Sequence, residues 1–181
     1  MRKLVVTEFM SLDGVVETPT WTFPYWNDEI AAFKGEESRA SDALLLGRVT
    51  YEGFAAVWPQ RTNEDDEGAD YFNSVRKYVV STTLERADWN NSRLIKGDVV
   101  AEIARLKQQD GGDITVHGSV ALAQTLIRHD LVDSYRLLVY PLVLGTGQRL
   151  FQDGTTARLR LAQTRAFSSG VAALIYEPDR G

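Results

Sequence analysis

The chain has 181 residues, of which 44% are hydrophobic, and it carries a net charge of −5 and no cysteine. This composition predicts one folded domain over residues 1–181, excludes disulfides, thiolate metal sites and cysteine nucleophiles, and argues against a nucleic-acid surface. No apolar run reaches the roughly 18 residues of a membrane span, and the first one is too short for a signal peptide. We therefore expect a cytoplasmic protein without membrane or nucleic-acid partners.

Buried-strand patterns alternate with helical patterns along most of the chain. Strands are expected at Leu4–Met10, Ala43–Leu46, Lys77–Ser81, Ser92–Ile95 and Ile114–His117. Helices are expected at Arg48–Val57, Tyr71–Arg76, Val99–Gln108 and Val120–His129, and from a cap at Asn27 to about Ala40. The stretches Glu17–Trp26 and Gln60–Ala69 are expected to be loops. The second is acidic, but consecutive carboxylates cannot all converge on one ion, so no metal site is expected.

The C-terminal segment shows strand patterns only. Ser134–Leu144 is β-rich with Pro141 inside it, so this strand should bend or lie at an edge there. Arg158–Phe167 and Val171–Glu177 form a hairpin pattern around Ser168-Ser169-Gly170. The order of elements predicts an α/β fold with a mixed, mostly parallel sheet, flanking helices and antiparallel C-terminal strands.

Two segments share one pattern, in which a short apolar run is followed by a glycine and then by the first turn of a helix. They are Asp42–Glu52, with Gly47, and Asp113–Ala123, with Gly118. Free N–H groups at a helix start bind anions, so two such turns predict a ligand with phosphates at two places, such as a dinucleotide. The alternative is that a βα junction needs a glycine only to turn tightly.

Polar side chains accompany the first of these turns. Arg48 and Thr50 open one predicted helix, and Ser81 and Thr82 end a predicted strand. If the two strands are neighbours, a guanidinium and hydroxyls converge as a phosphate monoester requires. The alternative places Arg48 on the surface and makes the hydroxyls caps.

Two further features are candidates for substrate contact. His117 ends an apolar strand directly before Gly118, where ligands sit in open α/β sheets, although it could instead be a structural histidine. A planar substrate could stack on the aromatic segment, with a carboxylate within reach, through Trp21, Phe23, Tyr25, Trp26 and Asp28. Alternatively, the aromatic side chains pack into the core, and Asp28 and Glu29 favour the helix N-terminus.

Four segments resemble, in order, those of the dihydrofolate reductase fold. They are Trp26–Lys34, which is similar to the substrate helix, Leu46–Glu52, Tyr78–Thr82 and Ile114–Ser119. The resemblance is closer to stand-alone relatives of the C-terminal reductase domain of bifunctional riboflavin-biosynthesis deaminase/reductase proteins. Those relatives share Ser11–Gly14, Leu131–Asp133 and Pro141–Gly147, so the resemblance covers nearly the whole chain.

The resemblance implies a role for each matched position. It implies that the cofactor would be NADP(H), with its 2′-phosphate at Arg48, Thr50, Ser81 and Thr82 and its pyrophosphate at the amides of Gly118, Ser119, Val120, Ala121 and Leu122. By the same resemblance, Asp13 and Gly14 should lie near the nicotinamide, and Glu29 falls where dihydrofolate reductase keeps its carboxylate. The chain departs from the family at Ser119, which replaces a glycine, at His117, which replaces an apolar residue, and in the aromatic loop.

We expect an NADPH-dependent oxidoreductase that transfers a hydride to a C=N or C=O group of a small planar substrate. The proton would come from Asp13, which we favour, from Glu29 or His117, or from a water. One alternative is a 5-amino-6-ribosylaminouracil-phosphate-type pyrimidine reductase of riboflavin biosynthesis, but Glu17–Asn27 contains no Arg or Lys for a ribityl phosphate. The other is a non-catalytic nucleotide-binding protein of the same fold. A homodimer is expected, because the family is commonly dimeric and the C-terminal strands need covered edges.

Overall fold

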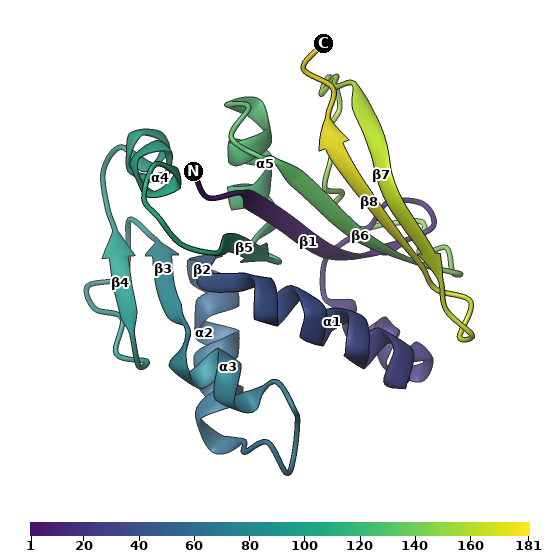
Figure 1. Cartoon of the computed structure of the whole chain (residues 1–181), viewed down its shortest axis with the longest axis horizontal. Coiled ribbons are helices and arrows are strands. Elements are labelled where there is room, and N and C mark those ends of the chain that lie inside the picture. Colours follow the sequence, from purple (N-terminus) through teal and green to yellow (C-terminus); the bar gives the residue numbers. More distant parts are fainter.

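The computed structural model describes all 181 residues, and its framework is one eight-stranded sheet with helices on both faces (Figure 1). The strands are β1 Leu4–Ser11, β2 Ser41–Gly47, β3 Arg76–Val80, β4 Ser92–Ile95, β5 Asp113–His117, β6 Ser134–Tyr140, β7 Leu159–Ala166 and β8 Ala172–Pro178. Their order across the sheet is β4-β3-β2-β5-β1-β6-β8-β7. Strands β1 to β6 run parallel, whereas β8 is antiparallel to both β6 and β7. This topology confirms the predicted fold class.

The helices fill the connections between the parallel strands. They are α1 Asp28–Ala40, α2 Arg48–Val57, α3 Ala69–Ser74, α4 Val99–Lys107 and α5 Val120–Arg128, with 3₁₀ turns η1 Pro19–Tyr25 and η2 Trp58–Gln60. Helices α1, α2 and α3 cover one face of the sheet, and α4 and α5 cover the other (Figure 1). Asn27 caps α1 as predicted, since its side-chain oxygen accepts a hydrogen bond from the Ile30 amide at 3.0 Å. None of these helices combines the length and apolar character required to span a membrane.

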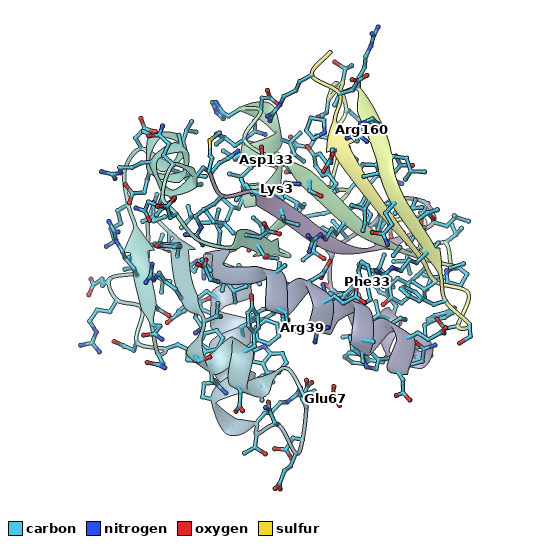
Figure 2. The ribbon with its side chains drawn as sticks, viewed as in Figure 1. Lys3, Phe33, Arg39, Glu67, Asp133 and Arg160 are labelled. Atoms are coloured by element: carbon cyan, nitrogen blue, oxygen red, sulfur yellow. The ribbon has the colours of Figure 1, made fainter.

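Alternate residues of the central strands build two separate cores. Leu45 of β2 packs with α4 and α5 on one face, and its neighbour Leu44 packs with Tyr51 of α2 on the other. A further cluster lies under α1, whose Phe33 side chain points from the helix toward the C-terminal strands (Figure 2). The apolar runs of the sequence therefore correspond to strands buried on both sides, as parallel sheets require.

Two elements differ from their predictions. The aromatic segment expected to be a loop contains η1. The strand expected to continue through Pro141 ends at Tyr140, because a proline has no N–H group to donate to the sheet.

The sheet splits between β1 and β5. These strands pair only from Leu4 to Thr7, where Thr7 lies opposite His117, whereas β1 continues to pair with β6 as far as Ser11. Beyond Thr7, residues Glu8 and Phe9 therefore have no partner strand on the β5 side. The carboxyl ends of strands in an open α/β sheet diverge in this way around a ligand.

Candidate functional site

A cavity of about 700 Å³ occupies the crevice between β1 and β5. It is lined by the ends of β1, β2 and β5, the first turns of α2 and α5, part of α1 and the segment before η1. The polar or charged side chains around it are those of Thr7, Glu8, Glu17, Thr18, Lys34, Arg48, Thr50, His117, Ser119 and Gln148. This volume is typical of a site that encloses a small organic ligand.

The two glycine turns meet at this cavity and are joined by one hydroxyl group. The Ser119 hydroxyl accepts a hydrogen bond from the Gly47 amide at 2.7 Å and donates one to the Thr50 hydroxyl at 2.9 Å. Gly118 and Ser119 both have left-handed backbones, with φ of 55° and 60°. A Cβ atom at Gly118 would lie 3.3 Å from the Thr50 hydroxyl oxygen, so the turns approach closely. The two helix starts are therefore held side by side.

Neither α2 nor α5 has a side-chain cap at its N-terminus. The backbone of residues 118–122 lines the cavity at the start of α5, and residues 47–50 line it at the start of α2. Uncapped first turns leave N–H groups that can bind anions, and here two such turns open into one cavity. The structure thus brings together the predicted phosphate-binding residues Gly47, Arg48, Thr50, Gly118, Ser119, Val120, Ala121 and Leu122.

Ser81 and Thr82, the residues after β3 that were predicted to contact a phosphate, do not line this cavity. Strands β2 and β3 are parallel neighbours, as the prediction required, and Gly47 lies opposite Val80. However, the Ser81 hydroxyl accepts hydrogen bonds from the amides of Thr83 at 3.2 Å and Leu84 at 3.0 Å. Ser81 therefore closes a local turn, and neither it nor the exposed Thr82 lines the cavity.

Asp13, the favoured proton donor, also lies outside the cavity lining, as does Gly14. The Asp13 carboxylate accepts hydrogen bonds from the Ser11 hydroxyl at 2.7 Å and from the amides of Leu144 at 3.1 Å and Gly145 at 2.8 Å. These hydrogen bonds, that of Ser11 first, lower the pKa of Asp13 to about 2. Asp13 is ionised at neutral pH and holds the loop after β6, so the structure does not support its assignment as the acid.

Glu29 is occupied in a similar way at the start of α1. Its carboxylate accepts hydrogen bonds from the Ser168 hydroxyl and, at 2.7 Å, from the Ser168 amide, and these lower its pKa. It therefore ties α1 to the β7–β8 turn rather than lining the cavity. Asp28 beside it is exposed and outside the cavity lining as well.

The aromatic segment does not form a stacking surface in the cavity. Trp21 and Tyr25 pack edge-on against the buried Tyr140, with ring centroids 5.4 and 5.7 Å away. Phe23 and Trp26 are exposed, and none of these four rings lines the cavity. The alternative interpretation, in which the aromatic side chains pack into the core, is correct for Trp21 and Tyr25.

His117 is the one predicted acid that does line the cavity. Its ring lies 6.2 Å from Phe54 and 5.6 Å from Phe72, between centroids. Burial, with a smaller effect from Lys34, lowers the pKa of His117 well below its ordinary value. The ring is therefore a neutral imidazole at physiological pH, able to donate one N–H but without the proton of an imidazolium.

Three charged residues of this cavity were not predicted as site residues: Glu8, Glu17 and Lys34. Glu8 is only 5% exposed, and one of its carboxyl oxygens is buried with no hydrogen-bond partner. Burial raises the pKa of Glu8 to about 8, and the nearby Lys34 opposes that rise. Lys34 donates to the Thr7 hydroxyl at 2.9 Å and forms an ion pair with Glu37. The sequence did offer one signal for Glu8, because it is a charged residue within a strand predicted to be buried.

Comparison with known proteins places the chain in a family. The RibD C-terminal domain family model matches residues 2–173. The chain belongs to this family. YyaP of Bacillus subtilis (strain 168) is 35% identical over 178 residues, which cover 97% of this chain and 94% of YyaP.

Solved structures show the same fold at low sequence identity. One is the diaminohydroxyphosphoribosylaminopyrimidine deaminase/5-amino-6-(5-phosphoribosylamino)uracil reductase of Thermotoga maritima, with a TM-score of 0.68 and 15% identity, covering 98% of this chain and 56% of that one. Another is dihydrofolate reductase from Enterococcus faecalis in complex with NADP(H), with a TM-score of 0.62 and 15% identity, covering 98% and 96% of the two chains. The fold of this RibD C-terminal domain is therefore that of dihydrofolate reductase.

Proposed function

We propose that this protein is an NADP(H)-dependent reductase that transfers a hydride to a C=N or C=O group of a small planar substrate. One observation carries the proposal: the uncapped starts of α2 and α5 open side by side into a cavity that extends to the split between β1 and β5. Two anion sites beside a strand-end crevice suit a dinucleotide. Membership of the RibD C-terminal domain family and the likeness to an NADP(H)-bound dihydrofolate reductase support it.

The chain's own residues suggest how the cofactor is held. The backbone amides of residues 118–122 would bind the pyrophosphate, and Arg48 and Thr50 would bind the 2′-phosphate. Arg48 is about half exposed and donates to Glu52 at 2.9 Å, so it can turn toward a phosphate at little cost. The bound nicotinamide would supply the hydride. Phe9 and His117 would shape the end of the crevice where the acceptor lies.

The pyrimidine reductase of riboflavin biosynthesis is the second candidate, and family membership favours it. That substrate carries a phosphate, which needs a cation near the substrate end of the cavity. Lys34 lines that end but is already paired with Glu37. We therefore favour a substrate without a phosphate group. A non-catalytic nucleotide-binding protein would bind NADPH but reduce nothing.

We also propose that the protein is a homodimer. Strand β7 lies at the edge of the sheet, and most of its residues are exposed. An open edge of this kind invites pairing with a second chain. Light scattering at micromolar concentration should give twice the monomer mass, and the monomer mass would contradict the proposal.

The reductase proposal is tested in two steps. NADPH fluorescence titrations measure cofactor binding, and absorbance at 340 nm then follows oxidation of NADPH by a cyclic imine, 3,4-dihydroisoquinoline, and by a cyclic ketone, isatin. We expect binding and oxidation with at least one acceptor. Absence of binding at millimolar NADPH would overturn the proposal, whereas binding without turnover would favour the non-catalytic alternative.

A further inference from the structure

We propose that Glu8, on strand β1, delivers the proton that accompanies hydride transfer in this cavity. The inference rests on the reductase function proposed above. It assigns the acid to the strand rather than to the Ser11–Gly14 turn or to helix α1. Of the acids considered from the sequence, Asp13 and Glu29 are held by other parts of the chain and lie outside the cavity lining, whereas Glu8 and His117 line it.

The place of Glu8 in the sheet points to this role. It is the first residue of β1 beyond the stretch paired with β5, so it lies where the crevice begins. Its side chain is more than nine-tenths buried and contributes to the cavity wall, yet one carboxyl oxygen has no hydrogen-bond partner. A buried polar atom without a partner is rare and costly. A ligand atom in the cavity would satisfy it.

The surroundings allow Glu8 to hold a proton and then to release it. Burial raises its pKa to about 8, so the carboxyl group is mostly neutral at pH 7. The other charged or titratable groups around the cavity are Glu17, Lys34, Arg48 and His117. Lys34 is the one that stabilises the ionised form of Glu8. The carboxylate formed by proton transfer would thus have a cation nearby.

In the proposed reaction, NADPH supplies the hydride and Glu8 supplies the proton. The hydride from NADPH forms a C–H bond at the acceptor carbon, and the C=N π pair moves to nitrogen. That nitrogen takes the proton from the Glu8 carboxyl oxygen, which leaves NADP⁺, an amine and a Glu8 carboxylate. Water then reprotonates Glu8 after product release. A C=O acceptor follows the same course and gives an alcohol.

The test compares Glu8→Gln with the wild type in the 340 nm assay, using whichever of 3,4-dihydroisoquinoline and isatin the wild type reduces faster. Glutamine keeps the shape of the side chain but has no acidic carboxyl proton. The kcat at pH 7 should therefore fall about a hundredfold, since general acids contribute 10²–10⁴-fold. NADPH affinity should stay within about twofold. The wild-type rate should fall as pH rises through about 8, because the acid form is lost, and Glu8→Gln should show no such limb.

Two further variants complete the comparison. Glu8→Asp keeps the carboxyl group but on a side chain shorter by one methylene. It should recover part of the rate, together with the fall in rate at high pH. Glu67→Gln makes the same chemical change on the loop before α3, away from the sheet (Figure 2), and should match the wild type. If Glu8→Gln turns over at the wild-type rate with the same pH profile, the Glu8 assignment is wrong and the reductase function stands. If the wild type reduces neither acceptor, the reductase function fails and the Glu8 role fails with it.

Discussion

Replacing Glu8 by glutamine should change how the stability of the protein depends on pH, whether or not a substrate is present. Burial raises the pKa of Glu8 in the folded protein to about 8, from the ordinary value of 4.5 that we take for the unfolded chain. Between these values the folded protein holds a proton that the unfolded chain has released. The free energy of unfolding therefore decreases as pH rises through this window.

The size of the effect follows from the shift. Each unit of difference between the two pKa values corresponds to about 1.36 kcal/mol, so a rise in the pKa of Glu8 from 4.5 to about 8 corresponds to about 5 kcal/mol of unfolding free energy across the whole window. Glutamine does not titrate and keeps its stability there. Relative to Glu8→Gln, the wild type should thus lose several kcal/mol between pH 5 and pH 8, a large part of the 5–15 kcal/mol typical of a domain.

Urea unfolding followed by circular dichroism at pH 5, 6, 7 and 8 measures this difference. The difference between the unfolding free energies of the two proteins cancels the contribution of every other titrating group. Glu67→Gln serves as a control that should follow the wild type at each pH. A constant difference between the wild type and Glu8→Gln from pH 5 to pH 8 would refute the reasoning. It would mean that Glu8 is ionised in the folded protein at neutral pH.

Three other substitutions test the remaining assignments, two at the cavity and one at Asp13 outside it. Arg48→Ala should weaken NADPH binding about tenfold and leave NADH binding nearly unchanged, because a charge-assisted contact to a phosphate contributes about 1.5 kcal/mol or more; equal effects on the two cofactors in fluorescence titrations would contradict this. Gly118→Val should abolish NADPH binding in a protein that circular dichroism shows to be folded, because a side chain there would displace the turn whose amides would bind the pyrophosphate. The backbone of Gly118 has a φ of 55°, which costs another residue about 1–2 kcal/mol, and a Cβ atom would lie 3.3 Å from the Thr50 hydroxyl oxygen. Asp13→Asn should lower the melting temperature at pH 7 more than at pH 2, because the carboxylate contributes stability above its ordinary pKa of 3.8 and loses it as pH falls through about 2; equal losses at both pH values would count against it.

The fold was predictable because its signals are local. Apolar runs ending in Gly47 and Gly118 identified β2 and β5, and the cap at Asn27 identified the start of α1. The extra length of β1 beyond β5 was not visible, because pairing depends on residues more than a hundred positions apart. That unpaired length determines where the cavity opens.

Cavity-lining residues were predictable where the backbone forms the lining, and not where a distant partner holds the side chain. The amides at the starts of α2 and α5 follow from the glycine turns. Asp13, by contrast, is engaged by amides 131 and 132 positions away, and Glu29 by an amide 139 positions away. Nothing in the short motifs around these carboxylates indicates such partners. A motif near a strand end thus locates a cleft more reliably than it selects the residue that acts there.

Ser119 shows how a serine can stand at a turn whose left-handed backbone favours glycine. A second glycine would adopt the left-handed backbone at no cost, whereas serine at φ 60° costs about 1–2 kcal/mol. Two hydrogen bonds, to the Gly47 amide and the Thr50 hydroxyl, contribute about 0.5–1.5 kcal/mol each and offset that strain. The hydroxyl also fixes the start of α2 against the start of α5, which a glycine cannot do. Both turns are therefore held in place without a ligand, so less ordering would remain to oppose the binding of an anion there.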